Sequence, residues 1–181
     1  MGPMYSGKTK RLLSERKALQ YNPTANTVCI THTYDDRYTK DGKIVAHDGE
    51  SYPAISLYKL LPFADSDPRY TAATHILIEE AQFFPDLYDF VVRAVDIHNK
   101  HILCAGLDGD YMRRPFGQIL DLLPHCDSLV KLVSDCSLCE KQGTAIFTAR
   151  LRGKGGEQVL IGGKDAYEPM CRKHFLDYYY K

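Results

Sequence analysis

Apolar residues recur along the chain in two spacings, one helical and one extended, and the two alternate. Helical spacing predicts a helix over residues 9–20, which Asn22-Pro23 ends. Short apolar and β-branched runs predict strands, and a second helical pattern falls between two of them. The strands are expected at 27–31, 75–80 and 102–107, and the helix at 87–98. Strands that alternate with helices are typical of an α/β fold with a parallel sheet.

Shorter segments complete the outline. We expect a short helix or strand at 55–61, a loop at 65–68, a short helix at 119–123 and a further strand at 129–133. Near the end of the chain, 145–151 and 157–163 read as two strands joined by a Gly-rich turn, which predicts a long hairpin. The change in character divides the chain into a nucleotide-binding α/β domain at 1–134 and a smaller domain at 135–181.

The first residues fit G-x-x-x-x-G-K-[ST], the phosphate-binding loop, which here consists of Gly2, Pro3, Met4, Tyr5, Ser6, Gly7, Lys8 and Thr9. Its glycines let successive N–H groups point at phosphate oxygens. Lys8 would reach the β- and γ-phosphates, and the Thr9 hydroxyl would hold Mg²⁺. The following helix adds its positive end. Because this motif normally follows a strand, we expect the first strand to be missing before Gly2.

Two acids end the strand expected at 75–80. Glu79 and Glu80 follow an apolar run downstream of a phosphate loop, which is the Walker B arrangement. Neighbouring side chains of a strand point to opposite sides, so one carboxylate can serve Mg²⁺ while the other takes a proton from an acceptor hydroxyl. The alternative is a solvated strand end without a catalytic role.

Other polar and aromatic residues leave more than one interpretation open. Asp35 and Arg37 follow the first expected strand, at the end where α/β sheets bind ligands, but a surface loop fits equally well. Phe83 and the phenylalanine after it could wall a flat ligand, although aromatic residues more often belong to the core. Arg113 and Arg114 could hold phosphate or form a surface pair.

Charge and composition narrow the function. The 181 residues contain 23 Lys plus Arg and 23 Asp plus Glu, so the formal net charge is zero. This argues mildly against a nucleic-acid-binding protein and disfavours a zinc-ribbon ATPase that binds DNA. No apolar run reaches the length of a membrane span. No signal peptide is visible, although a shortened N-terminus would hide a targeting segment.

Six cysteines are too few for a disulfide framework and suit a reducing compartment. Cys136-x-x-Cys139 and Cys171-x-x-His174 form two ligand pairs, which is the spacing of a closed, tetrahedral Cys₃His zinc site. A redox C-x-x-C is the less favoured interpretation, because a second pair is available downstream.

The segments GPMYSGKT, DDRY, IEEAQFFPD, LDGDYMRRPFGQI and CSLC…FTARL…IGGKDAY…CRKH occur in this order along nearly the whole chain. Together they closely resemble the cytosolic-type (type II) thymidine kinases. The resemblance implies a RecA-like parallel sheet with flanking helices and a small zinc domain, whose lasso loop covers the nucleoside. It also implies phosphoryl transfer from ATP, with Mg²⁺, to the 5′-hydroxyl of thymidine and of deoxyuridine, a salvage step of DNA precursor synthesis.

The resemblance also implies roles for individual residues. Glu80 matches the base that accepts the hydroxyl proton. ATP and Mg²⁺ are expected at Gly2 to Thr9, Asp35, Arg37, Glu79 and Gln82. The thymine pocket is expected from Met4, Phe83, Leu107, Tyr111, Phe116 and Thr148, and the lasso from Gln158, Val159, Leu160, Ile161, Gly162 and Tyr167. Family members are usually tetramers inhibited by thymidine triphosphate (dTTP), so we expect a cytoplasmic homotetramer with neither a nucleic-acid nor a membrane partner.

Four residues depart from the family pattern, among them Ala81, which replaces a usual glycine. Glu79 stands where Asp is usual and reaches farther towards the Mg²⁺ shell. His174 replaces a cysteine, which zinc accepts, and Tyr111 replaces a common phenylalanine and adds a hydroxyl at the pocket edge. With the missing first strand, Glu79 leaves open an alternative function, that of a catalytically impaired nucleotide-binding regulator with the same fold.

Overall fold

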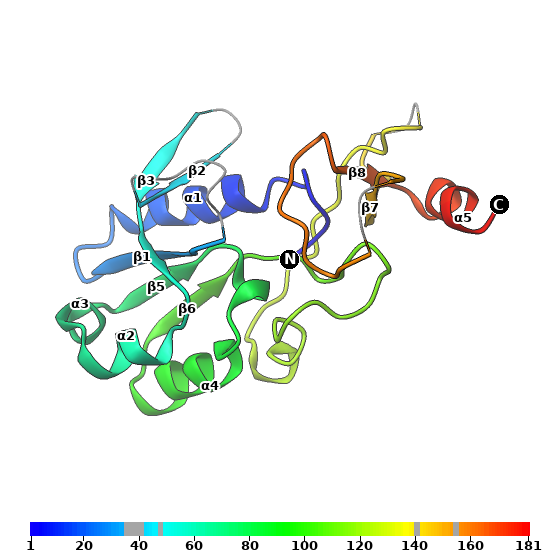
Figure 1. Cartoon of the computed structure of the whole chain (residues 1–181). Coiled ribbons are helices and arrows are strands. Elements are labelled where there is room, and N and C mark those ends of the chain that lie inside the picture. Colours follow the sequence, from blue (N-terminus) through cyan, green and yellow to red (C-terminus); the bar gives the residue numbers. More distant parts are fainter. Residues whose placement is uncertain (35–41, 47–48, 140–141, 154–155) are drawn as a thin grey trace.

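A four-stranded parallel sheet forms the centre of the larger part of the molecule (Figure 1). The structure is a computed structural model of the 181-residue chain and describes residues 1–34, 42–46, 49–139, 142–153 and 156–181. The sheet has the order β4-β1-β5-β6, and every neighbouring pair is parallel. Its strands are β1 (Thr27–His32), β4 (Ile55–Leu57), β5 (His75–Ile78) and β6 (His101–Cys104). The predicted α/β fold class is therefore confirmed.

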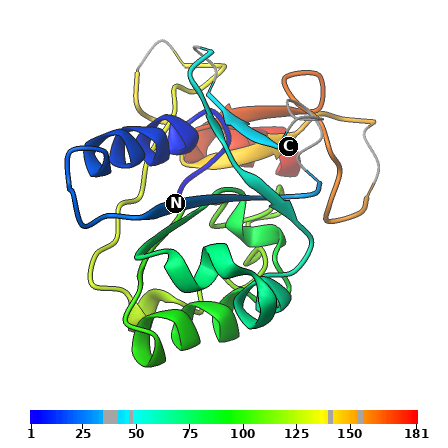
Figure 2. The ribbon, with the colours of Figure 1, turned by 90° about the vertical axis from the view of Figure 1, so that its left-hand side faces the viewer.

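Helices cover both faces of this sheet (Figures 1 and 2). On one side lies α1 (Lys8–Leu19), and on the other lie α2 (Leu61–Ser66), α3 (Pro68–Ala72) and α4 (Leu87–Val92), which continues into a π-helix, η2 (Arg93–Ile97).

The alternation of side chains along β5 explains this layering. Leu77 packs with Leu12 on the α1 side, whereas Ile76 and Ile78 belong to the opposite cluster around Phe90. Among the described residues, no helix has the length and the apolar character that a membrane span requires.

A second, smaller unit lies to one side of the parallel sheet (Figure 1). It contains the antiparallel pair β7 (Phe147–Arg150) and β8 (Tyr167–Met170), followed by α5 (Arg172–Tyr180). The hairpin expected between 145–151 and 157–163 is wrong, because β7 pairs with β8 instead. Residues 157–163 form no strand with it, since their apolar side chains line a cavity. The division of the chain at residue 135 stays a prediction that fits this placement.

Other local predictions need correction. The loop expected at 65–68 contains the end of α2 and the start of α3, because Asp67 caps the Arg69 N–H and Pro68 occupies the first helical position. The prediction of a helix at 119–123 is wrong. The chain forms turns at 119–122 and then a 3₁₀ turn, η3 (Leu123–His125). A short antiparallel ribbon, β2 (Lys43–Val45) with β3 (Ser51–Pro53), was missed because each strand has only three residues, too few for a periodic pattern.

The prediction of a strand at 129–133 is also wrong. The backbone hydrogen bonds of this segment nevertheless show where a further strand would pair. Met1 N donates to Val130 O (2.9 Å), and Leu132 N donates to Met1 O (2.8 Å), which is the alternation of a parallel ladder. On the other side, Gly2 N donates to Gly106 O (3.3 Å), just beyond β6. Residues 1–2 therefore lie as the end of a strand would, between β6 and residues 130–132. We propose that this edge of the sheet accepts a further parallel strand.

Extending the chain before Met1 with six β-branched residues should test this proposal. The added segment would pair with the free edge of β6 and cover Leu103 and Val130, which are 38% and 52% exposed. We expect the midpoint of thermal unfolding to rise by several degrees, at about 2–4 °C per kcal/mol gained for a chain of this length. A Gly-Ser extension of equal length is the control. Equal midpoints for the two extensions would contradict the proposal.

Candidate active site

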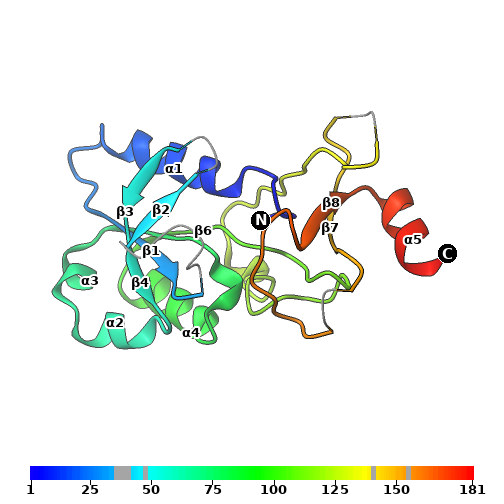
Figure 3. The ribbon, with the colours of Figure 1, turned by 45° about the horizontal axis from the view of Figure 1, so that its top comes forward.

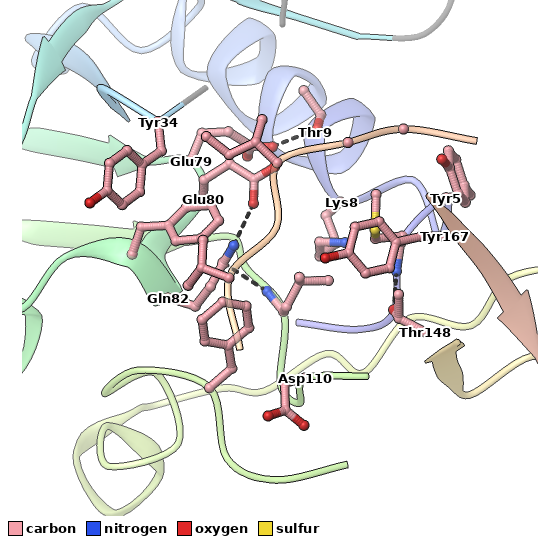
Figure 4. A pocket seen from close by; sticks show the side chains of 18 of the residues that line it. Tyr5, Lys8, Thr9, Tyr34, Glu79, Glu80, Gln82, Asp110, Thr148 and Tyr167 are labelled. Carbon is pink, nitrogen blue, oxygen red and sulfur yellow. Dashed lines mark hydrogen bonds between the residues drawn. The ribbon is translucent and has the colours of Figure 1, made fainter. Parts of the chain in front are cut away.

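A cavity of about 500 Å³ lies at the carboxyl ends of the parallel strands (Figure 4). The loop before α1, the residues after β5 and β6, the β2–β3 ribbon, β7 and residues 158–164 all contribute to it. Most of the site residues expected from the sequence line this one cavity, namely Met4, Tyr5, Gly7, Lys8, Thr9, Glu79, Glu80, Gln82, Phe83, Leu107, Tyr111, Phe116, Thr148, Gln158, Val159, Leu160, Ile161, Gly162 and Tyr167. Side chains from chain segments far apart in sequence therefore share one space.

A few predicted residues lie elsewhere. Gly2 pairs through its backbone with Gly106 and does not line the cavity. Pro3 borders a neighbouring cavity of about 130 Å³, and Ser6 donates its hydroxyl to the Pro3 carbonyl (2.8 Å). Asp35 and Arg37 fall in 35–41, outside the residues that the structure describes.

The loop before α1 is shaped to receive an anion. Gly7 has φ 80°, and the non-glycine Tyr5 also lies in the left-handed region with φ 63°. Such a backbone is strained at Tyr5, and strain of this kind is typical of functional loops. Lys8 Nζ donates to the Pro3 carbonyl (2.7 Å), so its ammonium group curls over the loop. No acidic residue lies in the first turn of α1, which leaves its positive end unneutralised by its own side chains.

The two acids have different neighbours (Figure 4), although both lie beyond β5, which ends at Ile78 and not at residue 80. Glu79 is 3% exposed, and its Oε1 accepts a hydrogen bond from the Thr9 hydroxyl (2.5 Å). Glu80 is less buried and has φ 52°, in the left-handed region. Its Oε2 accepts from Gln82 Nε2 (2.6 Å). A hydroxyl and a carboxylate are the hard oxygen ligands that suit Mg²⁺, so Thr9 and Glu79 fit the predicted cation.

Gln82 connects Glu80 to the strand end at β6. Its side chain donates to Glu80, and its Oε1 accepts from Leu107 N (2.9 Å). Gln82 is 2% exposed because the backbone closes around it. A Cβ at Gly117, which has φ 59°, would lie 2.0 Å from the Gln82 carbonyl oxygen, so only glycine fits there. Gly117 belongs to the segment LDGDYMRRPFGQI, but no local pattern in that segment predicts this role.

Aromatic side chains form one wall of the cavity, and they settle an alternative left open by the sequence. Phe83 lines the cavity and contacts Phe116 edge to face (ring centroids 5.5 Å apart), whereas Phe84 is 1% exposed and belongs to the core. The apolar-wall and core interpretations therefore apply to one phenylalanine each.

Behind this wall lies His32, at the end of β1 and 1% exposed. Its ring contacts Tyr34, Phe83 and Phe84, with centroids 4.7, 5.6 and 4.8 Å away. Its Nδ1 lies 3.1 Å from the backbone N–H of Tyr34, which donates to it. Burial lowers the pKa of His32 below its usual value, against the opposing carbonyl and carboxylates of its surroundings. A neutral His32 therefore fixes the start of the loop that follows β1.

The smaller unit also reaches the cavity. Thr148 of β7 accepts the Met4 N–H on its hydroxyl (2.9 Å), which joins the phosphate loop to β7 (Figure 4). Asp110, which the sequence did not single out, is 4% exposed and accepts from Gln158 Nε2 (3.0 Å). It also pairs with Arg114 Nε (2.8 Å).

Arg113 and Arg114 have structural contacts rather than a place in the cavity wall. Arg114 pairs with Asp110, whereas the Arg113 guanidinium lies over the Phe175 ring, 5.0 Å from its centroid. Among residues that the sequence did not assign to the site, Tyr34, Lys164 and the β2–β3 ribbon also line the cavity. No local pattern marks these residues, because only the fold brings them there.

Four potential metal ligands meet in the smaller unit. The ligand atoms of Cys136, Cys139, Cys171 and His174 all lie within 4.8 Å of one another, and they form the one such cluster within the described ranges. His174 Nδ1 lies 3.5, 3.2 and 3.4 Å from the three sulfurs in turn. A tetrahedral site with bonds of about 2.0–2.3 Å needs ligand separations of this size. The cluster is compatible with zinc.

Comparisons with known proteins match nearly the whole chain to thymidine kinases. A family model described as thymidine kinase matches residues 1–175. The thymidine kinase of rice (Oryza sativa subsp. japonica) is 41% identical over 98% of this chain, and thymidine kinase a of Arabidopsis thaliana is 40% identical over 97%. The thymidine kinase of Vaccinia virus (strain Western Reserve) is 36% identical over 98%. The chain spans 65% of the rice protein, just under two thirds, 73% of the Arabidopsis protein and 94% of the viral one.

The lowered pKa of His32 predicts a loss of stability in mild acid. The unfolded chain takes up the proton near pH 6.5, whereas folded His32 resists it, so the stability linked to this group is complete above pH 6.5 and falls as the pH drops below it. We expect the thermal midpoint to fall less between pH 7.5 and pH 5.5 in His32→Asn than in the unmodified chain. The exposed His125→Asn is the control. An unchanged pH dependence in His32→Asn would contradict the assignment.

Proposed function

The chain belongs to the thymidine kinase family, and from this premise we propose that it transfers the γ-phosphoryl group of ATP to the 5′-hydroxyl of thymidine, and also of deoxyuridine. Family membership confirms the resemblance drawn from the motifs. The observation that best supports the reaction is the single cavity, in which a phosphate loop, a Thr–Glu pair, a separate glutamate and an apolar wall face the same space. The product is thymidine monophosphate, made by a salvage step of DNA precursor synthesis.

On the donor side, we propose that ATP and Mg²⁺ bind at residues 2–9 together with Asp35, Arg37, Glu79 and Gln82. Lys8 would exchange the Pro3 carbonyl for phosphate oxygens when ATP binds. The Thr9 and Glu79 oxygens would hold Mg²⁺, which neutralises charge that develops on the transferred phosphate. Glu79 already reaches Thr9, so its extra methylene relative to aspartate does not separate the two groups.

On the acceptor side, Glu80 is the proposed base. The hydroxyl of thymidine must lose its proton as the phosphoryl group arrives, and a carboxylate in hydrogen-bond reach can take that proton. The Gln82 amide donates to Glu80 Oε2 and so holds the carboxylate in one orientation. Because Gln82 is itself fixed by Leu107 N and by the backbone around Gly117, Glu80 is oriented by the rigid part of the molecule.

The base of the nucleoside is proposed to lie against the apolar wall and under residues 158–162. The pocket residues are Met4, Phe83, Leu107, Tyr111, Phe116 and Thr148, closed by Gln158, Val159, Leu160, Ile161, Gly162 and Tyr167. Backbone donors and acceptors of the closing segment would read the edge of the pyrimidine, and a base that leaves them unpaired is rejected. Excluding water from the cavity keeps ATP from being hydrolysed.

We further propose a structural Zn²⁺ at Cys136, Cys139, Cys171 and His174. The ligand separations and the Cys₃His donor set support it. From the family resemblance alone, we propose inhibition by dTTP, a homotetramer and a cytoplasmic location. The alternative function, a regulator that binds without turnover, is not favoured, and the absence of thymidine-dependent ADP formation would revive it.

Replacing the proposed base gives the most direct test of its role. Glu80→Gln keeps the shape of the side chain and removes the proton acceptor, so turnover should fall by about 10²–10⁴-fold. Thymidine should still raise the thermal midpoint, because the apolar wall is unchanged. Glu15→Gln, on the exposed face of α1, is the control and should keep full activity. Unchanged turnover in Glu80→Gln would rule out the assignment.

Removing the metal should loosen the smaller unit. A chelator that strips zinc is expected to release a single ion per chain and to lower the thermal midpoint, because the cluster clamps β7, β8 and α5 together. Cys139→Ser should lose the metal, whereas Cys126→Ser, at an exposed cysteine outside the cluster, should keep it. A metal-free chain with an unchanged midpoint would count against a structural zinc site.

A further inference from the structure

Arg150, the last residue of β7, is a buried cation whose partners are unusual. Its side chain is 3% exposed, yet its guanidinium contacts carbonyl oxygens, a phenol and aromatic rings. The Nε atom is buried and finds no hydrogen-bond partner among the described residues. Burying a charge is costly unless its contacts offset the loss of water. The groups that this guanidinium binds therefore indicate why the charge is buried here.

Two of the three hydrogen bonds that its side chain makes with described residues go to one short stretch, residues 156–163, which we call the lid segment. Nη1 donates to the Glu157 carbonyl, and Nη2 donates to the Gln158 carbonyl (3.1 Å). The planar fork of an arginine suits two neighbouring carbonyls at once. The lid segment lines the cavity from Gln158 to Gly163 and loops from β7 to β8 beside the ends of the parallel strands (orange in Figure 3).

Two tyrosines extend the same arrangement. Arg150 Nη2 donates to the Tyr167 hydroxyl (2.7 Å), which in turn donates to the Leu160 carbonyl (2.7 Å). The guanidinium carbon lies 3.9 Å from the centroid of the Tyr111 ring, and the Tyr111 hydroxyl donates to the Gly156 carbonyl (2.9 Å). Four carbonyls of the lid segment are thus held by Arg150 or by a ring that Arg150 touches.

The backbone of Arg150 is fixed from the opposite side. The Tyr179 hydroxyl of α5 accepts from Arg150 N (2.8 Å) and donates to Arg150 O (3.1 Å). Two residues earlier, Thr148 accepts the Met4 N–H, so β7 also contacts the phosphate loop. An anchor that is rigid at its backbone can hold a flexible segment with its side chain.

From these contacts we propose that Arg150 is a positioning residue that holds the lid segment closed over the nucleoside cavity. The inference rests on the proposed function only for the identity of the ligand. If the lid segment is closed for a smaller fraction of the time, the apparent affinity for nucleoside falls in proportion to that fraction. Arg150 would therefore act on thymidine affinity and on water exclusion, and not on the proton transfer itself.

The experiment compares Arg150→Met, Arg150→Lys and Arg152→Met with the unmodified chain. Met keeps an apolar stem and removes the guanidinium together with its hydrogen-bond donors. Lys keeps the charge but loses the fork, so its effect should be intermediate. The exposed Arg152 contacts Tyr178 of α5 rather than the lid segment, which makes it the matched control. Hydrogen exchange of residues 159–163 and direct thymidine binding are measured for each protein.

For Arg150→Met we expect exchange in the lid segment to become at least about tenfold faster, and thymidine to bind at least about tenfold more weakly. The KM for thymidine should rise more than kcat falls, and hydrolysis of ATP without acceptor should increase. Arg152→Met should match the unmodified chain. If Arg150→Met fails to fold, Arg150→Lys carries the same test, with the smaller shift in exchange and binding.

Lid exchange and thymidine affinity that stay unchanged in the Arg150 variants would overturn the inference, whatever their activity. A lack of thymidine-dependent turnover in the unmodified chain would instead count against the proposed function. In that case, faster lid exchange in Arg150→Met would still support the positioning role, because exchange is measured without any reaction.

Discussion

The parallel pairing of β1, β5 and β6 is the constraint on which the candidate site depends. Cys29 aligns with Leu77, and Leu77 aligns with Leu103, so the three strands end at the same edge of the sheet. The residues at and after these strand ends are then brought together, namely His32 at the end of β1, the two glutamates after β5 and Leu107 after β6. The Thr9–Glu79 hydrogen bond adds the phosphate loop to this edge and sets the donor side beside the acids.

The smaller unit supplies what a sheet edge alone lacks, which is a cover. Thr148 binds the backbone of the phosphate loop, Gln158 binds the buried Asp110, and Arg150 holds the lid segment. Thr148 and Arg150 lie on β7, and Ala149 of this strand packs with Cys136, Met170 and Phe175 in one core. The residues that contact the phosphate loop and the lid segment therefore belong to the same small unit as the Cys/His cluster.

The sequence predicts those parts of the candidate site that depend on residues close together along the chain. The phosphate loop, the apolar run before Glu79 and the two Cys/His pairs are short patterns whose chemistry is local, and the structure brings their members together. Asp67 followed by Pro68 was misread as a loop although it is a helix cap, which is also a local signal.

What the sequence could not predict depends on distant neighbours. Val159, Leu160 and Ile161 have the apolar character of a strand, but they line a cavity, and periodicity does not distinguish these two surroundings. Arg150 gave no signal because its partners are backbone carbonyls, which have no sequence signature. The residues at 129–133 look like a strand, but their backbone is paired with Met1 and with no strand among the described residues.

We propose that a nucleoside bound in the cavity at the strand ends receives a phosphoryl group from ATP. A coupled assay with thymidine, ATP and Mg²⁺, read for thymidine monophosphate, tests this proposal most directly, with cytidine nucleosides and a reaction without acceptor as controls. We expect the monophosphate to form only in the presence of thymidine or deoxyuridine. ATP hydrolysis that does not depend on acceptor, or binding of thymidine with no product, would contradict the proposal.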